Sequence, residues 1–99
     1  MTDFVKAAVA RTRDKSGTIT LGGTAQELMA SNPERSGFWL QNVSAGDLWI
    51  SDIGTAAATQ PSLKVAAGAI YESPMTGCPT GAISIFGATT GQAFSAREW

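Results

Sequence analysis

The side chains that usually carry catalysis are nearly absent from this chain of 99 residues. It contains no histidine and a single cysteine, Cys78. A serine or cysteine nucleophile needs an imidazole or an equivalent base to remove its proton. A lysine could act as that base, but no Ser-x-x-Lys motif precedes Lys6, Lys15 or Lys64. The residue types therefore argue against nucleophilic catalysis.

Carboxylates are the remaining candidates for acid and base chemistry. Asp47 and Asp52 flank one apolar segment, and Glu72 and Glu98 lie near the ends of two others. Glycoside hydrolysis needs two carboxyl groups at a set separation across the bond to be cleaved. Charges at turns and strand ends also keep a small domain soluble, and we favour that interpretation. We expect no catalytic residue and no enzyme activity.

No cofactor or metal is indicated either. Histidine is the commonest metal ligand, and one thiol cannot form a cysteine-rich zinc site or an internal disulfide. Gly22-Gly23 and the segment 87–91 are glycine-bearing, but Gln92 follows Gly91 where a phosphate-binding loop requires lysine. Hairpin turns explain both glycine segments.

The charge balance limits the partners. Lys and Arg number 7 against 8 Asp and Glu, a formal net charge of −1, whereas nucleic-acid binding draws on an excess of positive charge. The apolar runs are far shorter than the roughly 20 residues that span a bilayer, and the first residues lack a secretory signal pattern. We expect a soluble protein that binds neither nucleic acid nor membrane.

Short segments rich in β-branched and aromatic residues follow one another from Gly17 onward, separated by Gly, Pro, Asn or Asp. This spacing is typical of an all-β domain. We expect residues 1–16 to form an N-terminal arm, helical or extended, and residues 17–99 to form one domain. Residues 24–27 read Thr-x-x-Glu, a capping box, which predicts one short helical turn carrying Leu28 and Met29.

Two hairpins are predicted. The first joins residues 38–43 to 47–53, which would place Gln41 opposite Trp49, and the second joins Ile83 and Ile85 to Phe94 and Ala96 across a turn at 88–91. Further strands are expected at 18–21, 63–65 and 69–72. About seven short strands of this kind predict an all-β fold, either a small jelly-roll-like β-sandwich or a short barrel.

The first hairpin would be apolar on both faces. One face would carry Leu40 and Ile50, and the other Trp39 and Trp49. Only one face can point into the core. The other must meet a partner, be covered by a loop or the arm of the same chain, or offer a platform on which a sugar stacks. The interface candidates are Phe4, Val5, Val9, Arg35, Trp39, Gln41, Trp49, Ile53 and Trp99.

Two local patterns accompany these strands. Asn-Pro-Glu-Arg at 32–35 precedes an apolar strand that ends in Gln-Asn-Val-Ser at 41–44, and residues 68–72 read Gly-x-x-Tyr-Glu. With the segments 48–50 and 83–87, they make residues 17–98 resemble small β-sandwich virion proteins of tailed bacteriophages, which include capsid decoration, or cement, proteins.

The resemblance implies a role and partners. It implies a protein that binds the outside of an assembled capsid, contacts the major capsid protein, and forms a homo-oligomer, a dimer or a trimer, over junctions between capsid subunits. Such a protein is made in the bacterial host cytoplasm and ends on the virion surface. Two alternatives stay open, a carbohydrate- or receptor-binding module of a tail fibre or tailspike, and a head-tail adaptor or tail structural protein.

Overall fold

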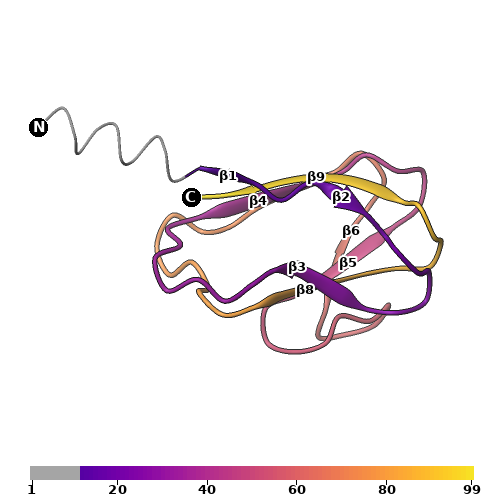
Figure 1. The fold of residues 1–99 in the computed structure, drawn as a ribbon. Helices are drawn as coiled ribbons and strands as arrows, with labels where there is room; N and C mark the ends of the chain where they lie inside the picture. The colour runs from indigo at the N-terminus through magenta and orange to yellow at the C-terminus, as the bar shows by residue number, and fades with distance from the viewer. Residues whose placement is uncertain (1–11) are drawn as a thin grey trace, which may run out of the picture.

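A computed structural model describes residues 12–99, which form two antiparallel sheets packed face to face (Figure 1). Sheet A has the order β1-β9-β4-β7, with β2 also paired to β9, and sheet B has the order β3-β8-β5-β6. The strands are β1 (Arg13–Asp14), β2 (Gly17–Thr18), β3 (Gln26–Met29), β4 (Phe38–Asn42), β5 (Leu48–Ser51), β6 (Leu63–Val65), β7 (Ile70–Glu72), β8 (Ile83–Gly87) and β9 (Ala93–Glu98). The predicted all-β sandwich is confirmed.

The strand pairs are nested within one another along the chain. β5 pairs with β6, β4 with β7, β3 with β8 and β2 with β9, all antiparallel. The chain is therefore one long antiparallel ribbon that folds over on itself, and the β4–β9 and β5–β8 pairs complete the two sheets. A double-sheet fold of this kind is a jelly roll.

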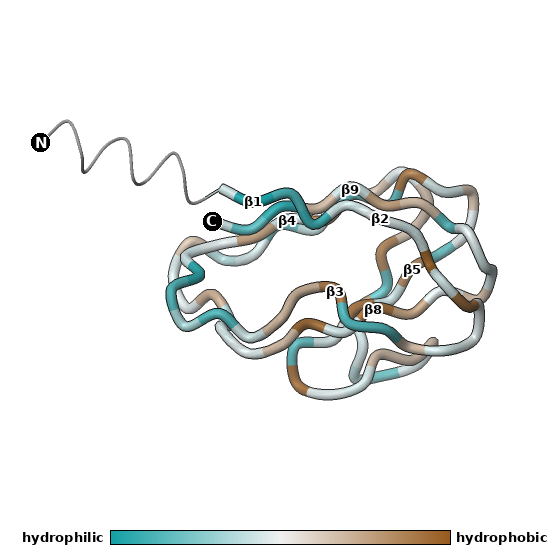
Figure 2. Tube along the Cα trace, in the orientation of Figure 1, coloured by the Kyte–Doolittle hydropathy of each residue, from teal (hydrophilic) through white to brown (hydrophobic). Residues whose placement is uncertain are grey.

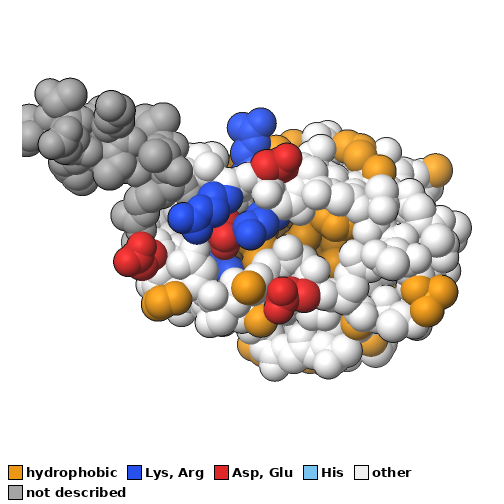
Figure 3. All heavy atoms as spheres, viewed as in Figure 1, with side chains coloured by type: hydrophobic (Ala, Val, Ile, Leu, Met, Phe, Trp, Pro, Cys, Tyr) orange, Lys and Arg blue, Asp and Glu red, His pale blue; other side chains and the backbone are white. Residues whose placement is uncertain are grey.

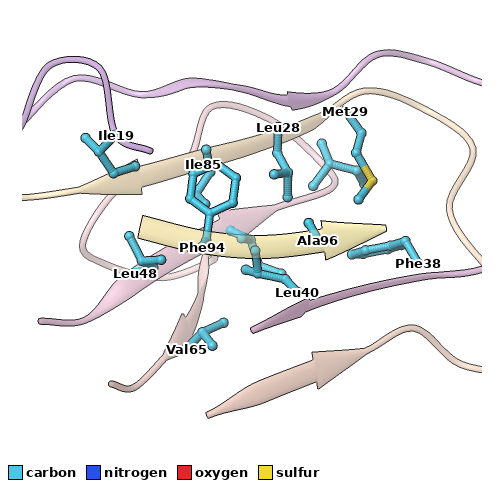
Figure 4. Close-up of a cluster of buried hydrophobic side chains, with 12 residues drawn as sticks. Ile19, Leu28, Met29, Phe38, Leu40, Leu48, Val65, Ile85, Phe94 and Ala96 are labelled. Carbon is cyan, nitrogen blue, oxygen red and sulfur yellow. The ribbon is translucent and has the colours of Figure 1, made fainter. Parts of the chain in front are cut away.

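The core lies between the sheets and follows the two-residue period of the strands. β4 and β8 both alternate buried and half-buried residues. Hydrophobic residues occur in both layers (Figure 2), and their buried side chains meet between the sheets (Figure 4). Fully burying one large apolar side chain stabilises the folded state by about 1.5–3 kcal/mol relative to leaving it exposed. The cluster comprises Ile19, Leu28, Met29, Phe38, Leu40, Leu48, Ile50, Val65, Ile83, Ile85, Phe94 and Ala96.

The first predicted hairpin is wrong. β4 belongs to sheet A and β5 to sheet B, so the segment 43–47 crosses between the layers. The buried Asn42 turns the chain out of sheet A, because its side-chain amide donates to the carbonyls of Gly46 (2.7 Å) and Val65 (2.8 Å) and accepts from the Ser44 N–H (2.9 Å). The core still contains the apolar residues of both strands: sheet A contributes Phe38 and Leu40, and sheet B contributes Leu48 and Ile50.

The second predicted hairpin is wrong for the same reason. β8 lies in sheet B and β9 in sheet A, and residues 88–92 connect the layers. The buried Gln92 holds this crossing through a bond from the Thr89 N–H (3.0 Å) and bonds to Ser44 Oγ and the Asp47 carbonyl (both 3.1 Å). Ile85 and Phe94 face each other across the core, whereas β4 supplies the sheet partner of Phe94.

The predicted helical turn is also wrong, because β3 occupies its place. The β3 strand pairs with β8, and a register shift between Glu27 and Met29 lets the adjacent Leu28 and Met29 both be buried. The long-range pairing with β8 outweighs the local capping signal. Earlier in the chain, Arg13 and Asp14 pair with β9, so the last residues of the predicted arm belong to the sandwich.

Candidate interaction surfaces

The core cluster contains no tryptophan, although the chain has three. Trp39 and Trp49 are half-buried and Trp99 is 36% exposed. Trp39 lies on the outer face of sheet A, Trp49 on the outer face of sheet B, and Trp99 follows β9 at the end of the molecule where the C terminus lies (Figure 1). Trp39 and Trp49 therefore do not share one face as the predicted hairpin required.

The outer face of sheet A presents two rows of side chains that run across the strands. In one row Arg97 of β9 lies between Asp14 of β1 and Trp39 of β4. The Arg97 guanidinium carbon is 5.5 Å from the Trp39 ring centroid, a cation–π contact. The neighbouring row pairs Ser95 with Gln41. With Thr12 and Ser16 these residues line an open depression, which we call the sheet A hollow.

The polar groups of the sheet A hollow are only partly used within the protein. Hydrogen bonding by the Ser16 side chain and by the Ser16 N–H, which donates to Asp14 Oδ1 (2.9 Å), lowers the pKa of Asp14, with a smaller contribution from the charge of Arg97. Among residues 12–99, the side chains of Trp39, Gln41, Ser95 and Arg97 make no hydrogen bond. Gln26 and Gln92, in contrast, use both ends of their amides inside the protein.

The outer face of sheet B is more apolar and partly covered. Trp49 lies between Phe86 of β8 and Lys64 of β6. The loop 52–62 folds back over the neighbouring part of the sheet, where the Ala56 N–H donates to Ser84 Oγ (2.9 Å) and the outward-facing Ser51 is buried. A covering loop from the same chain, one of the sequence-level alternatives, is thus present on part of this face. Ile53 at its start is 75% exposed.

The third surface gathers around Trp99. Its backbone N–H donates to the Gly37 carbonyl (2.9 Å) and its own carbonyl accepts from the Gly37 N–H (3.0 Å). A Cβ added at Gly37 would lie 2.6 Å from Cζ2 of Trp99, so the indole ring lies directly against the glycine backbone. Pro74 and Met75 line the same depression, and Met75 is 98% exposed. This end of the molecule therefore offers large apolar side chains to a partner.

Arg35 is buried within the sandwich, where it has a structural role, and it is not an exposed contact residue. It is 4% exposed, and its guanidinium donates to Glu98 Oε1 (2.8 Å) and to the carbonyls of Pro79 (2.7 Å), Gly81 (2.9 Å) and Ala30 (2.8 Å). These partners lie in β9, in the β7–β8 connection and after β3. Arg35 thereby fastens three segments at one end of the sandwich, and its donors are not free for a partner protein.

Glu98 completes this charged cluster. It is almost fully buried, and Lys15 Nζ lies 3.7 Å from its second carboxylate oxygen. Burial alone would raise the pKa of Glu98, but the bonds and charges of Arg35 and Lys15 outweigh it and hold the pKa below its ordinary value. In Figure 3 charged side chains gather at this end of the edge formed by β1 and β9.

The other sequence candidates have mixed outcomes. Phe4, Val5 and Val9 lie outside the described residues. Gln41 joins Trp39 in the sheet A hollow, whereas Ile53 lines a separate depression with the carboxylates of Glu27 and Asp52. The sequence reasoning missed Asp14, Ser95, Arg97 and Met75. The outward positions of β9 alternate as Ser95 and Arg97, so strand period marks them as surface, but only the β4–β9 register places them beside Trp39.

The described residues form neither a metal-binding cluster nor a helix that could cross a membrane. Within residues 12–99 no group of three or more His, Cys, Asp or Glu side chains is placed to hold a metal ion. In the same part of the chain no helix is long and apolar enough to cross a membrane.

Comparisons with known proteins add no relative. No family model matches the chain, and no curated protein or solved structure is significantly similar to it.

Proposed function

We propose that the protein is a non-enzymatic structural component of a bacteriophage virion that decorates the capsid and stabilises it by bridging major capsid subunits as a homo-oligomer. The observation that carries the proposal is that the sandwich closes its core without tryptophan and leaves all three tryptophans at its surface. Tryptophan is the residue most enriched among those that dominate binding energy at protein interfaces. The fold itself does little to favour this function over others, because jelly rolls serve many functions.

The three tryptophans differ in their surroundings. Trp49 lies between Phe86 and Lys64 in sheet B, and Trp99 shares its depression with Pro74, Met75 and the carboxylate of Glu72. Trp39 instead lies among polar and charged side chains. An assembly interface is apolar at its centre and depleted of charge. We therefore assign the capsid and self-association contacts to the surfaces around Trp49 and Trp99.

The position of these surfaces suits a bridging role. Trp49 lies on one broad face of the sandwich, whereas Trp99 lies at one end, so two neighbours can be contacted at once. Each contact is modest, but copies repeated over a particle act together because opening one junction strains several contacts.

The test uses particles grown from the genome that encodes the chain, stripped of the protein and then reloaded with purified variants. Trp49→Ala and Trp99→Ala should each weaken binding about tenfold or more, as expected for a central interface tryptophan. Leu21→Ala is the matched control, because Leu21 is an exposed apolar residue at the opposite end. If both folded tryptophan variants bind like the parent, these surfaces do not make the contact and the proposal fails.

A further inference from the structure

The sheet A hollow combines an aromatic wall with polar groups that the protein does not use. Trp39, Gln41 and Ser95 are half-buried, yet their side chains make no hydrogen bond to the rest of the described chain. No buried side-chain nitrogen or oxygen in the described residues lacks a partner, so the Gln41 amide is open to solvent, and its oxygen and NH₂ can both bond to a ligand. These groups are therefore available to orient a ligand that sits against Trp39.

The charges of the hollow limit what that ligand can be. Asp14 and Arg97 are direct register neighbours, and they give +1 − 1 = 0 for the charged side chains that line it. Glu72 of β7, which lies opposite Trp39 just outside the hollow, adds a negative charge beside it. An anionic ligand would meet the Asp14 carboxylate and a cationic one the Arg97 guanidinium. The depression thus favours a neutral ligand that both donates and accepts hydrogen bonds.

The aromatic wall narrows the ligand further. An indole has two flat apolar faces and one N–H donor. The Arg97 guanidinium lies over the ring of Trp39, so the stacking surface is the part of the indole that Arg97 leaves exposed. A pyranose ring matches such a surface, because one of its faces is made of C–H groups while hydroxyls project from its rim. Those hydroxyls can accept hydrogen bonds from the side chains of Arg97 or Gln41. They can also donate hydrogen bonds to the Asp14 carboxylate, the Ser95 hydroxyl or the side-chain amide oxygen of Gln41.

We propose that the sheet A hollow is a binding site for a neutral saccharide, which stacks on Trp39 and is oriented by Gln41, Ser95, Asp14 and Arg97. The site lies on the face of the sandwich opposite to Trp49. It does not depend on the proposed capsid role. If that role holds, the saccharide is held on the side of the molecule that faces away from the Trp49 surface.

The test applies the full-length chain, fluorescently labelled, to an array of neutral and acidic bacterial glycans, followed by calorimetric titration of those retained. We expect retention of neutral glycans. Trp39→Ala should reduce affinity at least about tenfold, and Gln41→Leu, which keeps the size of the side chain without its polar groups, about fivefold. Trp49→Ala is the matched control and should bind like the parent.

Salt dependence gives an independent readout. The affinity for a neutral saccharide should change less than about twofold between about 50 mM and about 500 mM NaCl, because no charge pair is formed with the ligand. Retention of acidic glycans alone, no retention of any glycan, or binding unchanged in both Trp39→Ala and Gln41→Leu would overturn the proposal. Loss of particle binding in Trp49→Ala with glycan binding intact would separate this site from the capsid contacts.

Discussion

At the scale of single residues, two buried polar groups hold the ends of the sandwich. Arg35 fastens the end that carries the C terminus, and Asn42 fixes a crossing at the opposite end. Sequence reasoning placed Arg35 among the interface residues, whereas the structure buries it. Its burial depends on acceptors brought from separate segments, which no local pattern reveals.

Removing the Arg35 guanidinium should strongly destabilise the fold. Arg35→Met leaves the carboxylate of Glu98 buried without its main partner, and breaking a buried pair in this way costs about 3–5 kcal/mol of unfolding free energy. Urea denaturation measures the effect. Arg13→Met is the control, because Arg13 is exposed in β1, and it should change stability by less than about 0.5 kcal/mol. An Arg35→Met protein as stable as the parent would contradict the role given to this residue.

The same pair predicts how stability responds to acid. The pKa of Glu98 is lowered in the folded protein, so the folded state binds this proton less readily than the unfolded state does. The stabilisation is complete above the unfolded value of about 4.3 and is lost as the pH falls through the lower folded value. Thermal melts of the parent and Glu98→Gln between about pH 7 and pH 2.5 measure the contribution. A parallel decline of both proteins with falling pH would count against it.

At the scale of elements, the sequence predicted which residues share a face of a strand, but neither which face is buried nor which strands pair. Alternation places Phe38 and Leu40 on one face of 38–42, and Ile83 and Ile85 on one face of 83–87, and the structure buries these faces. Short predicted turns at 44–46 and 88–91 suggested hairpins, whereas the chain crosses between the sheets at both places. A loop of a given length can close a hairpin or span two layers, and the choice is made by pairings with strands far away in the chain.

The crossing at 88–92 packs against the turn at 19–24, and a glycine allows this close approach. A Cβ added at Gly22 would lie 2.5 Å from the Ala88 carbonyl oxygen and 2.7 Å from the Thr90 nitrogen, both backbone atoms. Gly22→Ala should therefore lower the unfolding free energy by about 1–3 kcal/mol. Gly54→Ala is the control, since nothing lies within 4 Å of its added Cβ. Equal melting temperatures for the two variants would refute the proposed contact.

At the scale of the whole molecule, the side chains that form the core of the jelly roll differ from those that lie at its surface and can contact a partner. Its core closes with aliphatic residues, methionine and phenylalanine, while the tryptophans are distributed over one end and both broad faces. The sequence indicated, from a hairpin that the structure does not contain, more large apolar side chains than one small core can hold. In the structure the tryptophans lie outside the core cluster. The sequence could not predict that Trp39 and Trp49 lie on opposite faces, because that follows from the crossing of the chain at 43–47.

The central claim is that the protein is attached to the outside of a capsid through the surfaces around Trp49 and Trp99. A cryo-electron microscopy reconstruction of intact particles grown from the encoding genome tests it most directly. We predict density for the sandwich over junctions between major capsid subunits, with Trp49 or Trp99 buried against a subunit or a second copy of the chain. Absence of the protein from the capsid, or a position there with both tryptophans facing solvent, would contradict the account.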